Sequence, residues 1–344
     1  IAGNGLNANS AGLLRLLSRN LSIDGQVNAQ QLEAVTGANA YDYTTGKASA
    51  ISGTDAAAQY AIDSTLLGGL YANRISLIST EQGVGVRMAG DAAASAADFT
   101  LSAAGDIQLN NKINAKQAID IQNSSAQQHK LNIQGGLTAN SIAIGDVNAQ
   151  KFNVDVAGGT LYAASTLELQ SQAFNANSGK IQAKDVLKLN ANADIALQNT
   201  AIDAADLQMK SNAFTAQDSQ LKSAQNLNIQ TAQDLKFKNT DAEVQNNIVL
   251  NTANSNMELA GGKLKAGNAL DLKANQLSFS AQTSAANTDI QVQQFTLDEN
   301  GLIVSQNNTA ITASNADLLG QLYSSAANLN ISGTLNSGNN TLVS

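Results

Sequence analysis

Short segments of alternating apolar and polar residues occur along most of the chain. In residues 179–198, an isolated Ile is followed by Leu187 and Leu189 and then by Ile195 and Leu197. Residues i and i+2 share one face of a β-strand, whereas they fall on opposite sides of a helix. The segments are bounded by Asn, Gly, Asp and Ser, which favour turns. The pattern therefore predicts short strands with one buried face.

These segments recur at a nearly constant distance. The middle pair of each group begins at Leu187, Leu207, Leu227, Ile248 and Leu270, a step of 20 to 22 residues. A β-sandwich or barrel does not require such a period, but a coil of three strands does, because each strand pairs with its equivalent one coil later. We therefore predict an all-β fold: a right-handed parallel β-helix (solenoid) with three short strands per coil of about 20–22 residues, its hand set by the crossover preference of parallel strands.

The composition fits a stacked fold better than an ordinary globular one. Charged residues make up 13% of the chain, against about 25% in an average domain, and Asn and Gln are abundant. Such a chain favours disorder or aggregation unless its amides stack in hydrogen-bonded ladders, which a solenoid provides within one molecule. The apolar fraction of 43% is adequate for a core.

The net charge limits the partners of the chain. It is −8 at pH 7, and phosphate binding needs a basic stripe, so we expect no nucleic-acid partner. The same charge argues against binding to an anionic membrane surface. No apolar run reaches the roughly 18 residues that a membrane span needs.

The chain changes character near residue 90. All the arginines precede this point, and every lysine except Lys47 follows it. No Pro-rich or charged linker separates the two parts, so we expect one continuous body. Because the sequence starts at Ile1 rather than Met, and because a β-helix needs caps on its end strands, we expect a fragment or a processed form of a longer protein.

Few residues suggest chemistry. His129 is the one histidine, in the insertion NSSAQQHK, and is expected to be a surface residue. Without a second His or any Cys, a metal site would need carboxylates alone, and no nucleophile motif accompanies His129. Lys180, Lys184 and Lys188 are interpreted as solvated charges on strands.

The acidic residues are also unlike those of an enzyme. Polysaccharide lyases and hydrolases with this fold need clustered carboxylates on one outer face. Here Asp203 and Asp206 are close, but Asp185, Asp194 and Asp234 each precede an apolar strand, as turn residues do. The calcium-binding nonapeptide of β-helices is not found. We therefore predict no catalytic, cofactor-binding or metal site, no small-molecule substrate and no enzyme activity.

Two segments resemble a known family. They are LLSRNLSIDGQVNAQQLEAVTGANAYDY, residues 16–43, and AIDSTLLGGLYANRISLISTEQGVGVRMAG, residues 61–90. Both resemble the end of the secretion domain of two-partner-secretion exoproteins, which include filamentous haemagglutinins, large adhesins and contact-dependent growth-inhibition toxins. The family pattern is matched by Val35 to Asn39, Asp63, Leu67 to Ala72, Ile75 to Ile78, and Thr80 to Arg87, with Leu70 in place of the family's Met.

The glycines of the second segment are interpreted as determinants of the fold. Gly83 and Gly85 alternate with valines, where they permit a tight corner or a close backbone approach. Gly68 and Gly69 are expected to form a turn before the strand that begins at Ile75.

The resemblance implies an organisation and a function. Residues 1–90 are expected to be the C-terminal part of the two-partner-secretion domain, and residues 91–344 haemagglutinin-type β-helix repeats. The first coils of the family's domain carry Asn-Pro-Asn motifs that contact the export machinery. Since this chain has no Pro, those coils are expected to be absent and no transporter-contact residue is assigned.

The implied protein is secreted to the surface of a Gram-negative bacterium, through an outer-membrane two-partner-secretion transporter. The chain would be a structural shaft that projects a distal toxin, as in contact-dependent growth inhibition. The alternative is an adhesin of the filamentous-haemagglutinin type, with a receptor on a neighbouring bacterium or host cell. A remote alternative is a carbohydrate-active β-helix enzyme.

Overall fold

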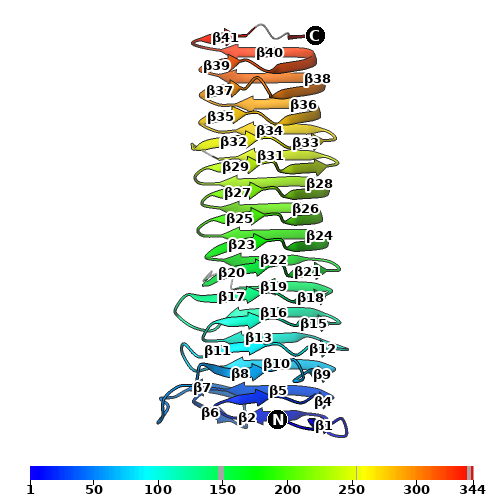
Figure 1. Ribbon diagram of the computed structural model, residues 1–344, viewed down its shortest axis with the longest axis vertical. Coiled ribbons are helices and arrows are strands. Elements are labelled where there is room, and N and C mark those ends of the chain that lie inside the picture. The colour runs from blue at the N-terminus through cyan, green and yellow to red at the C-terminus, as the bar shows by residue number, and fades with distance from the viewer. Residues whose placement is uncertain (146–150, 253, 339–341, 344) are drawn as a thin grey trace. The chain divides into compact units, whose positions relative to one another are not determined.

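The computed structural model describes residues 1–145, 151–252, 254–338 and 342–343. The chain divides into two compact units, Ile1–Phe174 and Asn175–Ser344. Each unit is a parallel β-helix with three strands per coil (Figure 1). The predicted fold class and strand number are therefore confirmed, whereas the right-handed winding stays a prediction. None of the described residues forms a helix long and apolar enough to cross a membrane.

In the first unit, three ladders of parallel strands form the sides of the coil. The first ladder runs through β1 (Leu6–Ala8), β4 (Val27–Ala29), β9 (Leu70–Ala72), β12 (Ala92–Ala94), β15 (Lys112–Ala115), β18 (Gly136–Ala139) and β21 (Thr160–Ala163). The second runs through β2 (Leu14–Leu17), β5 (Gln31–Thr36), β10 (Arg74–Ser79), β13 (Phe99–Ala103), β16 (Ala118–Asn123), β19 (Ser141–Ile144) and β22 (Leu167–Ser171). The third runs through β3 (Leu21–Ile23), β8 (Tyr60–Ser64), β11 (Gly85–Met88), β14 (Ile107–Leu109), β17 (His129–Ile133) and β20 (Phe152–Ala157).

In the second unit, one ladder corresponds to the third ladder above. It contains β25 (Ile195–Gln198), β27 (Phe214–Gln217), β29 (Leu235–Lys238), β32 (Asn256–Ala260), β35 (Gln276–Phe279), β37 (Gln294–Leu297), β39 (Asn315–Leu318) and β41 (Leu335–Ser337). The division between the units falls within β23 (Ala173–Asn177).

The other two sides of this unit are joined in most coils into one long strand. These long strands are β24 (Lys180–Ala191), β26 (Ala201–Ser211), β28 (Gln220–Thr231), β36 (Gln282–Gln291), β38 (Leu302–Ala313) and β40 (Gln321–Ile331). Two coils keep separate strands, β30 (Asp241–Val244) with β31 (Asn247–Asn251) and β33 (Lys263–Ala266) with β34 (Ala269–Lys273). The last strand is β42 (Leu342–Val343).

The predicted repeat is present as a column of stacked side chains. Leu187, Leu207, Leu227, Ile248 and Leu270 are successive partners in the parallel register. All five side chains are buried, at 1% exposure or less. The period read from the sequence is therefore the length of one coil.

One boundary differs from the prediction. The segments of Ile181 and of Leu187 lie in the same strand, β24, whose register shifts between Ala183 and Val186. Asp185 therefore lies inside a strand, at an exposed bend, rather than in a turn before one. The bend needs no interruption of the strand because the ladder resumes after the shift.

The interior of both units consists of apolar side chains that alternate with exposed ones. All seven phenylalanines are less than 2% exposed. In the third side of the coil, Phe214 and Phe237 pack with ring centroids 5.9 Å apart, and Ala216, the register partner of Phe237, leaves room for the ring. At this point of the stack a small residue therefore lies beside a large one, as close packing requires.

Candidate interaction surface beside the second coil

An insertion leaves the coil between β5 and β8. It comprises residues 37–59 and contains an antiparallel hairpin of β6 (Asn39–Asp42) and β7 (Lys47–Ala50). The turn is closed by Asp42, whose carboxylate accepts hydrogen bonds from the Thr45 hydroxyl at 2.7 Å and the Thr44 N–H at 2.8 Å. The Thr45 hydrogen bond is the main reason that the pKa of Asp42 lies below its ordinary value.

An ion pair fixes the start of this insertion to the coils. The Arg19 guanidinium donates to both carboxylate oxygens of Glu81, at 2.7 and 3.1 Å, and to the backbone oxygen of Asp55 at 2.9 Å. Glu81 also accepts the N–H of Ala38 at 3.0 Å. The Arg19 hydrogen bond is the largest cause that holds the pKa of Glu81 below its ordinary value. One pair therefore joins the first coil, the third coil and both ends of the insertion.

A second arginine supports the hairpin from below. Arg15 lies over the Tyr41 ring, 5.1 Å from its centroid, and donates to Glu33 at 2.9 Å. The Tyr41 hydroxyl donates to the other oxygen of Glu33 at 3.1 Å. Desolvation first, and then this hydrogen bond, raise the pKa of Tyr41. The ring of Tyr41 is thus held by Arg15 and its hydroxyl by Glu33. Tyr43 packs edge-to-face against Tyr41, with the ring centroids 5.1 Å apart.

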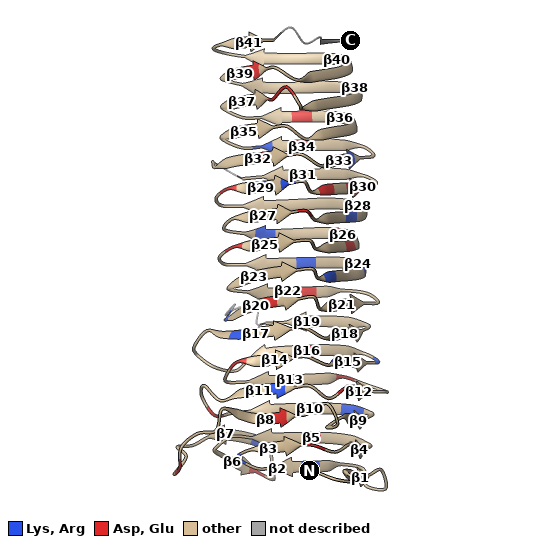
Figure 2. Cartoon of the chain, viewed as in Figure 1, with Lys and Arg blue, Asp and Glu red and all other residues tan. Residues whose placement is uncertain are grey.

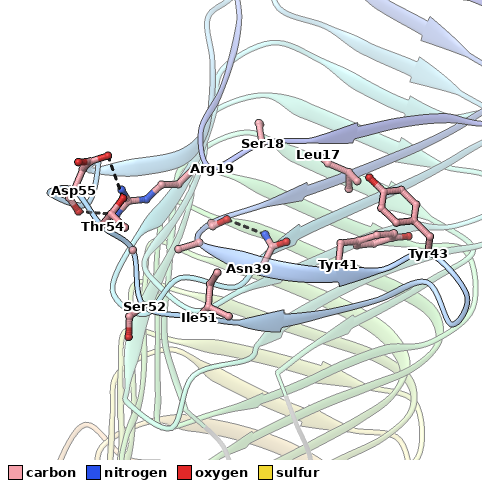
Figure 3. A pocket seen from close by; sticks show the side chains of 13 residues that line it. Leu17, Ser18, Arg19, Asn39, Tyr41, Tyr43, Ile51, Ser52, Thr54 and Asp55 are labelled. Atoms are coloured by element: carbon pink, nitrogen blue, oxygen red, sulfur yellow. Dashed lines mark hydrogen bonds between the residues drawn. The ribbon is translucent and has the colours of Figure 1, made fainter.

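The hairpin and the first coil enclose a groove of about 500 Å³ (Figure 3). Its walls combine exposed apolar side chains with short polar ones. The lining residues are Leu17, Ser18, Arg19, Gly37, Ala38, Asn39, Tyr41, Tyr43, Ile51, Ser52, Gly53, Thr54 and Asp55. No residue of this groove was assigned a site from the sequence, although Tyr-Asp-Tyr followed by Thr-Thr-Gly is a hairpin signal with two aromatic side chains on one face.

His129 is not the surface residue that was expected. It begins β17, and its side chain is only 13% exposed, with Nδ1 3.4 Å from a carboxylate oxygen of Asp106. The reason is that the insertion before it, including the buried Ser125, packs back onto the coil: the Ser125 hydroxyl donates to Gln82 at 2.7 Å.

Several aspartates have a structural role at the strand starts. Asp194 and Asp234 precede β25 and β29, as predicted, and each accepts the backbone N–H of a residue one coil later, Ala213 at 3.1 Å and Asn256 at 3.2 Å. Asp91, Asp98, Asp106 and Asp241 accept from Lys112, Ala118, Lys130 and Lys263 in the same way. A recurring carboxylate therefore caps the next coil at these corners.

Charged residues are scattered over the coils of each unit rather than gathered in a stripe (Figure 2). Asp203 lies exposed and Asp206 half-buried on β26. Lys180 and Lys184 are exposed, and Lys188 is half-buried on the outer face of β24. Within the described residues, no group of three or more His, Cys, Asp or Glu is placed to hold a metal ion.

Comparison with known protein families finds a match for the first part of the chain. Residues 1–109 match the family model of the two-partner-secretion domain. This part of the chain is therefore similar to a two-partner-secretion domain. The family recognised from residues 16–43 and 61–90 is thereby confirmed, while the domain boundary at residue 90 stays a prediction.

The relatives are very large proteins. The chain is 43% identical over 115 residues to the tRNA nuclease CdiA-2 of Burkholderia pseudomallei, a match that covers 33% of this chain and 4% of that protein. It is 33% identical over 215 residues to the tRNA nuclease CdiA of Yersinia mollaretii, covering 60% of this chain and 7% of that protein. It is 35% identical over 114 residues to the filamentous hemagglutinin of Bordetella pertussis, covering 30% of this chain and 3% of that protein. No solved structure matches the chain.

The motif of the two-partner-secretion domain has a structural explanation in its charged residues. Arg87 donates two hydrogen bonds to Asp63, both at 2.8 Å, across the ladder between β8 and β11. The same guanidinium lies 4.7 Å from the ring centroid of Tyr60. The Arg87–Asp63 pair thus joins neighbouring coils, and the Glu81–Arg19 pair joins the third coil to the first.

Two of its glycines, Gly83 and Gly85, act as predicted. Gly83 has a φ of +76°, which forms a tight corner, and a Cβ on Gly85 would lie 2.7 Å from the backbone oxygen of Asp106. Gly68 donates its N–H to the backbone oxygen of Thr65 at 2.9 Å and closes a turn, but the strand that follows directly is β9 and not the strand of Ile75, β10, as was expected. Leu66 and Leu67 in this turn are 82% and 76% exposed.

Proposed function

We propose that the chain is part of the structural shaft of a secreted protein at the surface of a Gram-negative bacterium. The observation that carries this proposal is the two-partner-secretion domain followed by coils that stack in register. Each coil buries its apolar side chains only against its neighbours, so such a fold extends by adding coils. The domain implies a two-partner-secretion transporter in the outer membrane as the partner during export.

The shaft would project a toxin in contact-dependent growth inhibition. Relatives named as tRNA nucleases support this role, although the chain spans only 4% and 7% of two of them. The match to a filamentous hemagglutinin supports the second candidate, an adhesin. In both cases a distal region would bind the receptor, on a neighbouring bacterium for the toxin and on a host cell for the adhesin.

A contact-competition assay with the full-length protein separates these candidates. Producer cells are mixed with unprotected cells of the same species, either in contact or across a membrane. Death of the neighbours only on contact supports toxin delivery. Survival of the neighbours, with retained adhesion that is lost on deletion of the gene, supports the adhesin and contradicts the toxin.

We also propose that the nuclease activity named for the relatives does not belong to this part. The net charge of −8 opposes binding to RNA. The purified chain, incubated with total tRNA and divalent cations, is expected to leave the RNA intact. Cleavage that persists in a preparation from a second, unrelated expression host would contradict the proposal.

Folding outside the cell would assist export by adding coil after coil. Leu189 lies within β24, in register with Met209, and proline there removes a ladder hydrogen bond. Leu189→Pro is expected to slow secretion of the full-length protein, while Leu189→Val, which keeps the strand, secretes normally. Equal secretion of both variants would show that coil folding does not drive export.

A further inference from the structure

The hairpin of the insertion has a strand edge that no other strand covers. In the coils, a strand pairs with its equivalents one coil before and one coil after, as β10 does with β5 and β13. Among the described residues, β7 pairs with β6 alone, in a sheet of two strands beside the first coils (Figure 1). Three of its four residues are exposed, and Ala48 is half-buried. The insertion therefore places an unpaired strand edge at the surface of the first unit.

The register of the hairpin shows which backbone groups are free. Ala38 and Ile51 continue this register, and the Ile51 N–H donates to the Ala38 oxygen at 2.9 Å. Hydrogen-bonded and non-hydrogen-bonded pairs alternate between antiparallel strands. The backbone of Ser49 therefore also faces β6, whereas the N–H and C=O groups of Ala48 and Ala50 point away from it. Two donors and two acceptors thus face outwards along this edge.

The side chains of β7 leave this edge accessible. Natural proteins protect sheet edges with proline, with charged side chains or with a covering element. Here the free groups belong to two alanines with Ser49 between them, and Lys47 is the one charged residue of the strand. A two-stranded hairpin is marginally stable on its own, whereas a sheet of more strands is stable. A further strand therefore finds no obstacle at this edge and would stabilise the hairpin.

The occupant that best fits the edge is the same edge of a second copy of the chain. We propose that two chains associate through their β7 strands, which pair antiparallel about a two-fold axis at Ser49 and join the two hairpins into one four-stranded sheet. Ala48 then lies opposite Ala50 of the partner subunit, and each such pair exchanges two hydrogen bonds. Every outward donor of one edge meets an outward acceptor of the other, as a self-complementary two-fold contact requires.

The charges near the edge favour this register. Lys47 lies opposite Ile51 of the partner subunit, so the two Lys47 residues are separated by about 13 Å along the strands. Like charges are therefore not opposed, which would destabilise the pair. The methylene groups of each lysine can instead cover the Ile51 side chain, which is 55% exposed. A different protein would have to supply a free edge of its own, whereas self-pairing needs only this chain.

The contact is small, so the association is expected to be weak. The four residues of β7 carry it on each side, whereas a stable interface has roughly 20–30 residues a side. Two shafts held close together at one surface would favour it, whether they project a toxin or an adhesive region. A covalent trap is therefore a better test than a binding constant.

A single cysteine at the proposed axis tests the pairing. Opposite residues of a non-hydrogen-bonded pair have Cα atoms about 4.5 Å apart, within the disulfide range of about 4.4–6.8 Å. Because the chain has no cysteine, Ser49→Cys supplies the only thiol. Under mild oxidation of the purified chain, this variant is expected to form disulfide-linked dimers, measured by non-reducing electrophoresis. Lys47→Cys is the matched control, since it is exposed on the same face of the same strand but too far from its counterpart to bridge.

We expect Ser49→Cys to dimerise at least about tenfold faster than Lys47→Cys, because the proposed register brings only the first pair of thiols within bonding distance. Proline then tests the hydrogen bonds, since it lacks an N–H and is tolerated on an edge strand where that N–H faces solvent. Ala48→Pro added to Ser49→Cys should therefore remove the fast dimerisation and keep the hairpin, which retained exchange protection of the Ile51 N–H would show. Equal dimerisation of the two cysteine variants would overturn the proposal, as would fast dimerisation that persists with Ala48→Pro in an intact hairpin.

Discussion

The two units build the same corner of the coil with partly different residues: glycine occurs there in both units, whereas a left-handed Asn or Asp occurs only in the second among the described residues. The corner joins a strand of the third side to the first strand of the next coil and is two residues long in most coils. At three of these corners in the second unit, the first residue is Asn199, Asp218 or Asn239, with φ of +48° to +50°. Glycine is the second residue of the corner at Gly135 and Gly159 in the first unit and at Gly262 and Gly320 in the second.

The difference follows from what the second corner residue contacts. A Cβ on Gly135 would collide with the backbone of Asn111 in the coil below. In the second unit, Thr200 and Thr240 occupy this position, and their hydroxyls donate to the backbone oxygens of Ala176 and Ala216 at 3.0 and 2.9 Å. The residue before each of these threonines, Asn199 or Asn239, is left-handed, whereas the corner at Gly135 fits because the side chain is omitted.

The units also differ in where side-chain chemistry occurs. The first unit holds the arginine ion pairs and the long insertion of residues 37–59, which separates the register partners Leu32 and Ile75. In the second unit, equivalent residues of adjacent coils are only 18 to 22 residues apart, as for Leu270 with Thr288 and Ile248 with Leu270. Regular coils serve stacking, whereas departures from the period carry the candidate interaction surface.

The largest effect is expected in the part that both units share, the core. Phe237→Ala removes a fully buried ring between Ala216 and Leu259 and should cost about 3–5 kcal/mol in local stability. Phe99→Ala in the first unit, between Ile75 and Ile119, should cost about as much. Hydrogen exchange of the flanking strands measures both.

Lys236→Ala, on the exposed face beside Phe237, is the control and should change little. A loss confined to one of the two phenylalanine variants would mean that the cores of the units differ as well as their corners.

The next largest effect on stability is expected at a glycine corner of the first unit. Gly135→Ala places a Cβ against the Asn111 backbone and should destabilise the first unit by more than about 1 kcal/mol. Gly136→Ala, one residue later, meets nothing closer than 3.9 Å and should be neutral or slightly stabilising. Urea unfolding of the two variants measures this difference. Equal urea midpoints would show that contact with the Asn111 backbone is not the reason for glycine at position 135.

The sequence predicted the second unit better than the first, for a physical reason. The period of the second unit is visible in the sequence because apolar residues such as Leu187 and Leu207 stack on one another. The same alternation of buried and exposed residues recurs in every coil. The groove could not be predicted this way, because Leu17 and Tyr43 come together through the insertion and the Arg19–Glu81 pair, which join distant segments. His129 was misplaced for the same reason: its burial depends on how an insertion folds back.

A smaller effect on stability is expected at the left-handed corner residue Asn239 of the second unit. Asn239 has a φ of +48°, is exposed and donates to Asp218 at 3.2 Å. Asn239→Val should cost about 1–2 kcal/mol, since a β-branched residue resists this conformation. Asn239→Gly accepts it and should stay within about 0.5 kcal/mol of the unmodified chain. If valine and glycine gave the same urea midpoint, backbone conformation would not govern this corner.

The smallest effect on global stability, and the most local one, belongs to Glu81. Arg19 lowers the pKa of Glu81 in the folded chain. The stabilisation of the insertion by this ion pair is therefore complete at pH values above the unfolded pKa of about 4.3, and it is lost as the pH falls through the folded pKa. Hydrogen exchange of residues 37–59, followed from pH 7 towards pH 3 and corrected for intrinsic rates, should show this loss of protection. Glu81→Gln should lose protection already at pH 7 and respond less to pH, while the strands of the second unit keep theirs in both proteins. An insertion equally protected in Glu81→Gln would mean that the hairpin is held by Tyr41 and its contacts alone, and that the groove keeps its shape without the ion pair.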